Sequence, residues 1–466
     1  MPHSTRGRRA HQIETLRAQF AQADGLPFAD VLSGERVERA LDEEGASWRE
    51  AVYTPLLTLW AFLAQVMSPD GSCRAAVAHV LAWLVAQGQP PCTPKTDPYC
   101  KARRRLPAAL LPRLVRETGR ALHAEAPADW RWKGRKVKVV DGTTVSMPDT
   151  PANQRAYPQN AAQAPGLGFP IARLVVVFCL GCGAALDAAL GRYQGKEAGE
   201  NALLRALAGT FDPGDVVLGD RYYGGWFDLA LWRRRGVDVV ARLHQLRTAD
   251  FRRGRRLGPR DHVVVWPKPQ RPGWMDEATY AGLPAGLAVR EVGVRVEQPG
   301  FRTRRLVAVT TLLDAQAFGA RDLAALYRAR WHAELDLRSL KIALGMDVLR
   351  CKSPGMVGKE VWAHLLAYNL IRTVMAQAAL DLGAAPRDLS FKGALQSLAA
   401  FGERLLTAAP DTAEALRAWL LLAIGSHLVG DRPDRVEPRA RKRRPKDYPH
   451  LHRPRHEART YRYAKT

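Results

Sequence analysis

The spacing of hydrophobic positions changes along the chain and divides it into segments of different predicted structure. Over residues 1–130 apolar side chains recur three and four residues apart, which is typical of helices. From residue 136 short apolar runs alternate with helical patterns. Strands are expected at 136–140, 171–180, 184–193, 215–218 and 237–243, and helices at 200–211 and 227–235. Three strands followed by helix, strand, helix and strand predict a mixed sheet with helices on its faces.

The pattern changes again after residue 245. Strand-like segments separated by Pro- and Gly-rich turns indicate a β insertion, after which helical patterns return. The predicted fold class is α/β: a ribonuclease-H-like mixed-sheet core interrupted by a β insertion, with a helical N-terminal domain and a helical, basic C-terminal region. The expected bounds are 1–130 for the helical DNA-binding domain, 131–245 and 319–430 for the two parts of the core, 246–318 for the insertion and 431–466 for a basic tail.

The net charge of the chain indicates which class of molecule it binds. The 466 residues carry a formal net charge of +24, and such an excess of cations favours a polyanion, with nucleic acid as the first candidate. The most apolar segments, 55–67 and 418–424, are too short to span a bilayer, and the chain does not begin with the apolar run of a signal peptide. We therefore expect a soluble, intracellular protein that binds DNA and no membrane.

Two basic segments are candidates for DNA contact. A helix expected over 73–87 is followed by a Pro-rich loop and a short basic helix, an order that fits a helix-turn-helix reader as well as a basic surface helix of a bundle. The tail, with its centre at Arg439–Arg444, fits a contact with DNA phosphates or a solubilising segment. The candidate contacts of the short helix are Lys101, Arg103, Arg104 and Arg105.

Two other short motifs are weak. Cys179 and Cys182 have the spacing of metal ligands, but no second pair accompanies them, and the neighbouring glycines fit a hairpin turn. The segment 191–196 is one residue too short for a phosphate-binding loop, and Glu197 stands where serine or threonine is needed. No nucleotide cofactor is expected.

Residues 327–341 are the strongest candidate for chemistry. Each residue of an α-helix advances about 100°, so a set of polar side chains in this segment shares one face. Asp336 points the opposite way. We therefore expect the replacement of Asp336 by alanine to be nearly silent. That face would present a carboxylate among cations to a phosphate backbone, or it is a solvated surface with an ordinary Glu–Arg pair. Its members are Tyr327, Arg330, Trp331, Glu334, Arg338 and Lys341.

Asp141 and Asp220 each follow an apolar strand. The first and fourth strands should be neighbours at the centre of the sheet, which would bring the two carboxylates together. Two such anions repel each other unless a cation lies between them. Glu334 can complete the cluster. Three carboxylates favour magnesium or manganese, and a pair of such ions about 3.5–4 Å apart suits in-line phosphoryl displacement.

These residues resemble those of bacterial DDE transposases of the insertion-sequence-four type, over roughly residues 135–345. The resemblance implies that Asp141, Asp220 and Glu334 bind two divalent ions, Mg²⁺ or Mn²⁺. It also implies that water cleaves the phosphodiester at each transposon end and that the freed 3′-hydroxyl attacks target DNA. The matching motifs are Asp141-Gly-Thr-Thr, Asp220-Arg-Tyr-Tyr and Tyr-x2-Arg-x3-Glu-x6-Lys at Tyr327, Arg330, Glu334 and Lys341.

The resemblance also implies partners and a location. These are terminal inverted repeats and target DNA, a second copy of the chain in a synaptic homodimer, and the bacterial cytoplasm with its nucleoid. Tyr327, Arg330 and Lys341 would hold end phosphates with Trp331 beside them, and Trp266 or Trp274 is a candidate to stack on a flipped base. Two alternatives stay open: a ribonuclease-H-like metal-dependent nuclease without strand transfer, and a catalytically inactive DNA-binding regulator.

Overall fold

The computed structural model describes residues 32–45, 52–86, 88–195, 198–295, 305–405 and 408–429, and part of 451–460. Several sequence-based predictions lie outside these residues. They are the helices expected in the first 31 residues, the basic centre of the tail at Arg439–Arg444, and Lys196 and Glu197 after the third strand.

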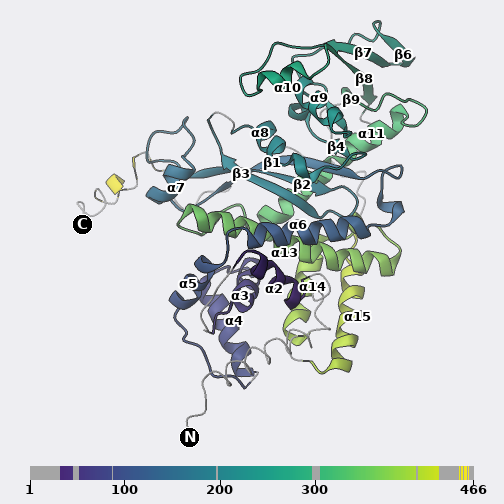
Figure 1. Ribbon diagram of the computed structural model, residues 1–466. Helices are drawn as coiled ribbons and strands as arrows, with labels where there is room; N and C mark the ends of the chain where they lie inside the picture. Colours follow the sequence, from purple (N-terminus) through teal and green to yellow (C-terminus); the bar gives the residue numbers. More distant parts are fainter. Residues whose placement is uncertain are drawn as a thin grey trace.

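A nine-stranded mixed sheet runs through the described residues in the order β3-β2-β1-β4-β5-β9-β8-β7-β6 (Figure 1). β1 pairs antiparallel with β2 and parallel with β4, and β4 pairs parallel with β5. The predicted mixed sheet with neighbouring first and fourth strands is therefore confirmed. The first five strands are β1 (Val137–Ser146), β2 (Ile171–Cys179), β3 (Ala185–Arg192), β4 (Val216–Leu218) and β5 (Asp238–Arg242).

The strands of the expected insertion continue this sheet. β9 pairs antiparallel with β5, and β8, β7 and β6 follow in antiparallel order, so backbone hydrogen bonds join the core to the insertion. The short strand β6 did not stand out in the sequence. The bounds are β6 (Arg255–Gly258), β7 (Asp261–Pro267), β8 (Gly286–Arg295) and β9 (Arg305–Thr310).

Helices cover both faces of the core strands. α6 (Leu110–Glu125) and α13 (Pro354–Leu382) lie against one face, and α8 (Glu200–Ala206) and α9 (Trp226–Arg234) lie against the other (Figure 1). In β1 the apolar side chains alternate between the two hydrophobic clusters, because successive residues of a strand point to opposite faces. By this alternation Asp141 faces the side of α6 and α13, and Gly142 faces the side of α8.

The remaining helices form a further layer beneath α6 and α13 or flank the sheet (Figure 1). None of the helices in the described ranges is long and apolar enough to cross a membrane. The helices are α2 (Gly34–Glu43), α3 (Pro55–Met67), α4 (Cys73–Ala86), α5 (Asp97–Arg105), α7 (Pro151–Ala156), α10 (Glu277–Ala281), α14 (Phe391–Leu405) and α15 (Pro410–Ser426).

The helix predicted across residues 327–341 consists of three pieces. α11 (Ala320–Ala329) and α12 (Trp331–Arg338) meet at Arg330, and a single π-helical turn (Ser339–Ala343) follows α12. Arg330 itself keeps a right-handed helical conformation, with φ −50° and ψ −32°, so the polar face continues across the junction.

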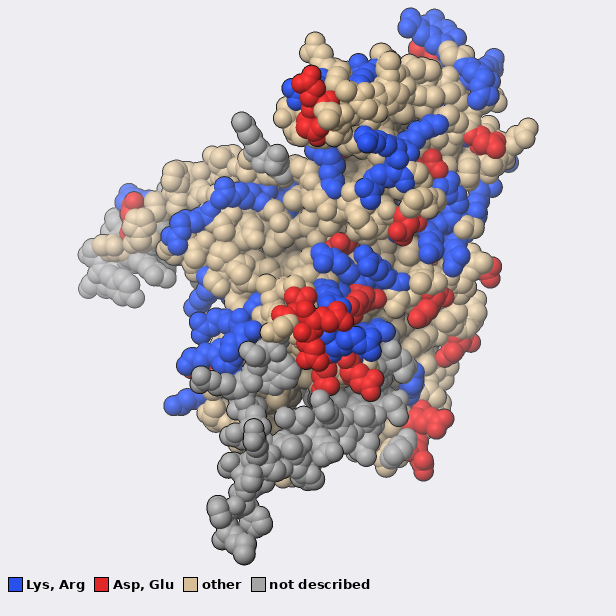
Figure 2. Space-filling model, in the orientation of Figure 1, with Lys and Arg blue, Asp and Glu red and all other residues tan. Residues whose placement is uncertain are grey.

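Charged side chains are unevenly distributed on the face that Figure 2 shows. Lys and Arg predominate over the right side of the part that holds the later strands and α11 in Figure 1, although one cluster of Asp and Glu lies at its upper left. The largest cluster of Asp and Glu lies lower, near the centre, with Lys and Arg beside it. A polyanion approaching the right side of the upper part therefore meets mainly cations.

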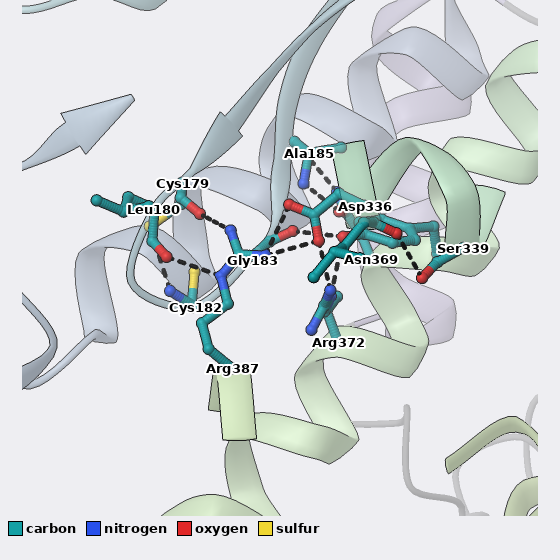
Figure 3. A network of polar contacts seen from close by, with 12 residues as sticks. Cys179, Leu180, Cys182, Gly183, Ala185, Asp336, Ser339, Asn369, Arg372 and Arg387 are labelled. Carbon is teal, nitrogen blue, oxygen red and sulfur yellow. Dashed lines mark hydrogen bonds and ion pairs between the residues drawn. The ribbon is translucent and has the colours of Figure 1, made fainter. Parts of the chain in front are cut away.

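Asp336 anchors α12 to the interior (Figure 3). Its carboxylate is fully buried and accepts hydrogen bonds from Arg372 Nη2 at 2.5 Å and from Arg387 Nη1 at 2.6 and 2.7 Å. Arg387 also donates to the carbonyl oxygens of Cys179 and Leu180, both at 2.8 Å, and so connects α12 to the turn between β2 and β3. Asp336 does face away from the polar side of α12, but the expectation that its replacement would be nearly silent is wrong.

We predict that Asp336→Ala lowers the free energy of unfolding by about 3–5 kcal/mol, because it leaves two buried guanidinium groups without their carboxylate. Asp97→Ala, which breaks an exposed pair with Lys101, should change it by less than about 1 kcal/mol. Urea denaturation followed by circular dichroism measures both. Equal stability of the Asp336→Ala variant and the wild type would contradict the anchoring role.

Candidate active site

The sequence analysis expected Asp141 to follow the end of its strand. In the structure Asp141 lies inside β1. β1 continues to Ser146 because it pairs with β2 along its length, whereas its parallel pairing with β4 ends at Val139, opposite Leu218. Asp141 and Asp220 each follow this last parallel pair by two residues. Asp141 on β1 and Asp220 just after β4 therefore occupy matching positions beyond the paired part of two neighbouring strands, as expected from the topology.

The Asp220 carboxylate begins a tight turn. Its Oδ1 accepts a hydrogen bond of 2.7 Å from the backbone N–H of Tyr222, and it caps the short 3₁₀ turn Arg221–Tyr223. Such capping is a common role for an aspartate after a strand. The other carboxylate oxygen of Asp220, Oδ2, takes no part in the hydrogen bond with Tyr222.

Arg330 lies between the other two carboxylates. Its Nη2 donates to Glu334 Oε1 at 2.6 Å, and its Nη1 lies 3.9 Å from Asp141 Oδ2. The guanidinium is only 17% exposed, so solvent screens these charges weakly. The junction of α11 and α12 thus places Glu334 on the same guanidinium that faces Asp141.

The pKa of Asp141 responds to burial and to several charged neighbours. Burial raises the pKa of the Asp141 carboxyl to about 6, while Arg330 and the Gly142 N–H oppose this rise and the charges of Glu334 and Asp220 add to it. Two neighbouring anions therefore act on Asp141 at once. A positive charge beside Asp141 favours the ionised form of its carboxyl.

The three carboxylates offer oxygen ligands, which are the kind that hard divalent cations take. Among the described residues no three His, Cys, Asp or Glu side chains are placed to hold a single metal ion. The Arg330 guanidinium, however, already places positive charge between Asp141 and Glu334, where a cation is electrostatically favoured. Carboxylate oxygens are the ligands that magnesium and manganese prefer.

The other residues predicted on the polar face differ in their surroundings. Tyr327 is half-buried against the core, and burial raises the pKa of its phenol. Lys341 Nζ forms an ion pair of 2.8 Å with Asp347. Trp331 is 47% exposed, and Arg338 is also exposed.

The prediction that Arg103 contacts DNA is wrong. Arg103 is 6% exposed, and its Nη1 donates to Gln65 Oε1 at 3.1 Å inside the helical domain. Its guanidinium also lies over the rings of Phe62 and Tyr99, at 4.9 and 4.8 Å from their centroids. The other three predicted contacts of this segment are exposed: Lys101, Arg104 and Arg105.

Neither tryptophan proposed to stack on a base presents an open ring. Trp266 is 5% exposed, and its indole N–H donates to Glu291 Oε1 at 2.9 Å. Trp274 is 40% exposed, but the Arg205 guanidinium covers its ring at 3.7 Å from the centroid. Trp266 is therefore excluded as a stacking platform in this conformation.

Cys179 and Cys182 lie buried at the turn between β2 and β3, where Gly183 adopts a positive φ of 82°. His123 Nδ1 lies 3.0 Å from Cys179 Sγ, and these groups are not placed, within the described residues, to form a metal centre. The structure therefore supports the interpretation of Cys179 and Cys182 as part of a hairpin turn.

Sequence reasoning missed one carboxylate beside this site. Glu200, the first residue of α8, has its Oε2 3.5 Å from the hydroxyl of Tyr223, at the end of the turn that Asp220 caps. The available signal was a glutamate at the start of a helical pattern directly after the third strand. Nothing in the sequence alone distinguishes it from an ordinary first-turn acidic residue, which the helix dipole favours.

Comparison with known proteins identifies the family. The Transposase DDE domain model matches residues 132–370. Transposase InsG for insertion sequence element IS4 of Escherichia coli K12 is 27% identical over 429 residues, which cover 91% of this chain and 93% of that protein. The transposase for insertion sequence element IS421 of Escherichia coli is 37% identical over 75 residues, 16% of this chain and 20% of that protein.

A solved structure of the piggyBac transposase synaptic complex with hairpin DNA aligns with 88% of this chain and 87% of that chain, with a TM-score of 0.41 and 11% identity. The family assignment comes from the sequence comparisons. The match over residues 132–370 and the similarity to the IS4 transposase along most of the chain show that the protein belongs to the bacterial DDE transposases of the insertion-sequence-four type, which are metal-dependent enzymes of DNA transposition.

Proposed function

We propose that the protein cuts DNA at the ends of its insertion sequence and joins the freed 3′ ends to a target, with Asp141, Asp220 and Glu334 as the metal-binding carboxylates. The observation that carries this proposal is the position of Arg330, whose guanidinium lies between Asp141 and Glu334. Asp220 follows the neighbouring strand β4 by two residues, as Asp141 follows the last β1 residue that pairs with β4. The three carboxylates come from three separate segments of the chain.

The proposed cofactors are two Mg²⁺ or Mn²⁺ ions, each held by two of the three carboxylates. When bound, such ions activate the attacking oxygen and stabilise the leaving oxygen of a phosphodiester. Asp141 is the natural shared ligand, because the charges of both Asp220 and Glu334 act on it. Sharing in pairs is consistent with the absence of a single three-carboxylate site among the described side chains.

The cations of the polar face would hold the DNA backbone. Arg330 offers paired donors in a fixed plane, which matches the geometry of a phosphate. Once other cations neutralise Asp141 and Glu334, its donors are available to a phosphate oxygen. Lys341 and Tyr327 would contact neighbouring phosphates, with Lys341 exchanging its ion pair with Asp347 for DNA. We place Trp331 and Arg338 at the same DNA surface because both are exposed on or beside this helix.

Duplex DNA is the proposed partner of the wider surface. The net charge of +24 and the Lys and Arg side chains that predominate on the right side of the upper part in Figure 2 support it. We propose that residues 1–130 bind the terminal inverted repeats through Lys101, Arg104 and Arg105, that the tail adds phosphate contacts, and that two copies of the chain synapse two ends. Strand transfer to target DNA separates this proposal from a nuclease that only cleaves.

We predict that Glu334→Gln reduces cleavage of end DNA in magnesium at least about a hundredfold, because metal-ion stabilisation of the transition state is worth several kcal/mol. Binding of end DNA should change little. A cleavage assay on labelled end DNA, with a parallel gel-shift assay, measures both. Glu277→Gln, which alters an exposed glutamate on α10, is the matched control. Full cleavage by the Glu334→Gln variant would contradict the assignment of this carboxylate.

The short helix α5 yields a second prediction. Arg104→Ala combined with Arg105→Ala should weaken binding of end DNA and reduce the slope of log affinity against log salt by about 2, since each lost phosphate contact contributes about 0.9. Arg103→Ala should instead lower the thermal midpoint, because it removes a buried group that Gln65 and two aromatic rings surround. An unchanged salt slope in the double variant would show that α5 does not contact DNA.

A further inference from the structure

The two cysteines at the turn between β2 and β3 have the contacts of a reactive pair. His123 Nδ1 lies 3.0 Å from Cys179 Sγ, and the backbone N–H of Cys182 donates to the same sulfur at 3.5 Å. A hydrogen bond from the Cys182 thiol is the main cause that lowers the pKa of Cys179; burial opposes it, and the contact with His123 adds to it. Burial raises the pKa of Cys182. Cys179 is therefore the nucleophilic sulfur of the pair, and Cys182 stays a thiol beside it.

A small cavity reaches this pair. It has about 20 Å³ of space, enough for about one or two molecules the size of water, and both His123 and Cys179 line it. His123 is 8% exposed, and its Nε2 has no hydrogen-bond partner among the described residues. Arg131 also lines the cavity, and its buried Nε likewise has no partner there. Two buried nitrogens without partners indicate that the cavity takes up a small polar molecule.

The walls of the cavity suit a reactive cysteine. Trp132, Arg135 and Lys136 line it and are only half-buried, so a small molecule can enter on their side, whereas Cys179 is 4% exposed. The cations Arg131, Arg135 and Lys136 favour the thiolate form of a nearby thiol. Cys179 is therefore accessible to a small reagent and shielded from a large one.

A second pair of cysteines provides a comparison. Cys73 Sγ and Cys100 Sγ lie 3.8 Å apart, and Arg103 Nη2 donates to Cys73 Sγ at 3.1 Å. Burial nevertheless raises the pKa of Cys73, although Arg103 opposes this rise. We therefore expect Cys73 to react more slowly than Cys179.

We propose that Cys179 and Cys182 form a reversible oxidation site for hydrogen peroxide. The Cys179 thiol passes its proton to His123 Nδ1, and its sulfur attacks one peroxide oxygen. An S–O bond forms, the O–O bond breaks, the sulfur gives up two electrons, and the departing hydroxide takes a proton from His123 Nε2 to leave as water. The Cys182 sulfur then attacks Cys179, so that an S–S bond forms and the S–O bond breaks. The oxygen leaves with the Cys182 proton as a second water, and a small thiol reduces the disulfide again.

Oxidation would act on α12 through Arg387 (Figure 3). Arg387 donates to the carbonyl oxygens of Cys179 and Leu180 and to the carboxylate of Asp336. A disulfide between Cys179 and Cys182 constrains the backbone of this turn and shifts the carbonyl groups that Arg387 holds. This consequence rests on the proposed function, because it makes cleavage by the site of Glu334, two residues before Asp336, depend on the two thiols.

Mass spectrometry of the full chain, after treatment with hydrogen peroxide and alkylation of the remaining thiols, tests the site. We expect a Cys179–Cys182 disulfide that dithiothreitol reverses. In Cys182→Ser a sulfenic acid at Cys179 should accumulate and react with dimedone, because no second thiol replaces its oxygen. His123→Asn should slow the oxidation of Cys179 at least about tenfold, because asparagine offers no proton donor in place of Nε2. Cys100→Ser is the matched control and should leave this rate unchanged.

Oxidation confined to other cysteines, such as Cys73 and Cys100, would overturn the proposal, and so would an unchanged rate in His123→Asn. Should Cys182→Ser fail to fold, the disulfide mapped in the wild type decides. Cleavage of end DNA separates the proposal from the proposed function. Peroxide should abolish cleavage by the wild type, dithiothreitol should restore it, and Cys179→Ser should be insensitive. Equal cleavage by oxidised and reduced protein would overturn the connection through Arg387. If the reduced protein cleaves no end DNA, the proposed function falls, whereas the mapped disulfide still decides the oxidation site.

Discussion

Repulsion between carboxylates gathered where β1 and β4 stop pairing is the constraint on which the site depends. β1 and β4 bring Asp141 and Asp220 to matching positions, and α12 adds Glu334. Burial is the largest cause of the raised pKa of the Asp141 carboxyl, Arg330 opposes the rise, and the charges of Glu334 and Asp220 add to it. Arg330 supplies the opposing positive charge in the protein alone. The same need for charge explains why divalent cations suit the site.

The two sides of α12 carry two carboxylates with different tasks. Glu334 points to Arg330, while Asp336, two residues later, accepts hydrogen bonds from Arg372 and Arg387 in the interior. These arginines tie α12 to α13 and to the turn after β2. A half-exposed carboxylate is thus held at a defined place by a buried one on the same short helix, which is the rigid support that a metal ligand requires.

The sequence was most informative where periodicity and topology act together. The order of elements predicted that the first and fourth strands are neighbours, and the helical phase predicted that Glu334 faces Arg330 and that Asp336 does not. Charge alone was a poor guide to exposure. Arg103 looked like its neighbours Arg104 and Arg105, yet its phase on α5 turns it toward Gln65 and the core. Burial of a charged residue depends on partners from distant segments, which no local pattern contains.

Long-range pairing also explains the other differences. β9 joins β5 through backbone hydrogen bonds that any sequence can make, so the continuation of the sheet into the expected insertion left no specific signal. Glu200 and Gly142 are 58 residues apart in the chain, and only the packing of α8 on the sheet brings them together. The resemblance to a known family identified the chemistry, whereas these contacts required the structure.

The central claim is that the carboxylates around Arg330 form the site of the catalytic cations. Anomalous diffraction from crystals of the protein grown with Mn²⁺ and end DNA tests it most directly. The account predicts manganese density in contact with the Asp141 carboxylate, with Asp220 and Glu334 as further ligands and the Arg330 guanidinium moved onto a DNA phosphate. Manganese bound elsewhere, with Arg330 still between Asp141 and Glu334, would contradict it.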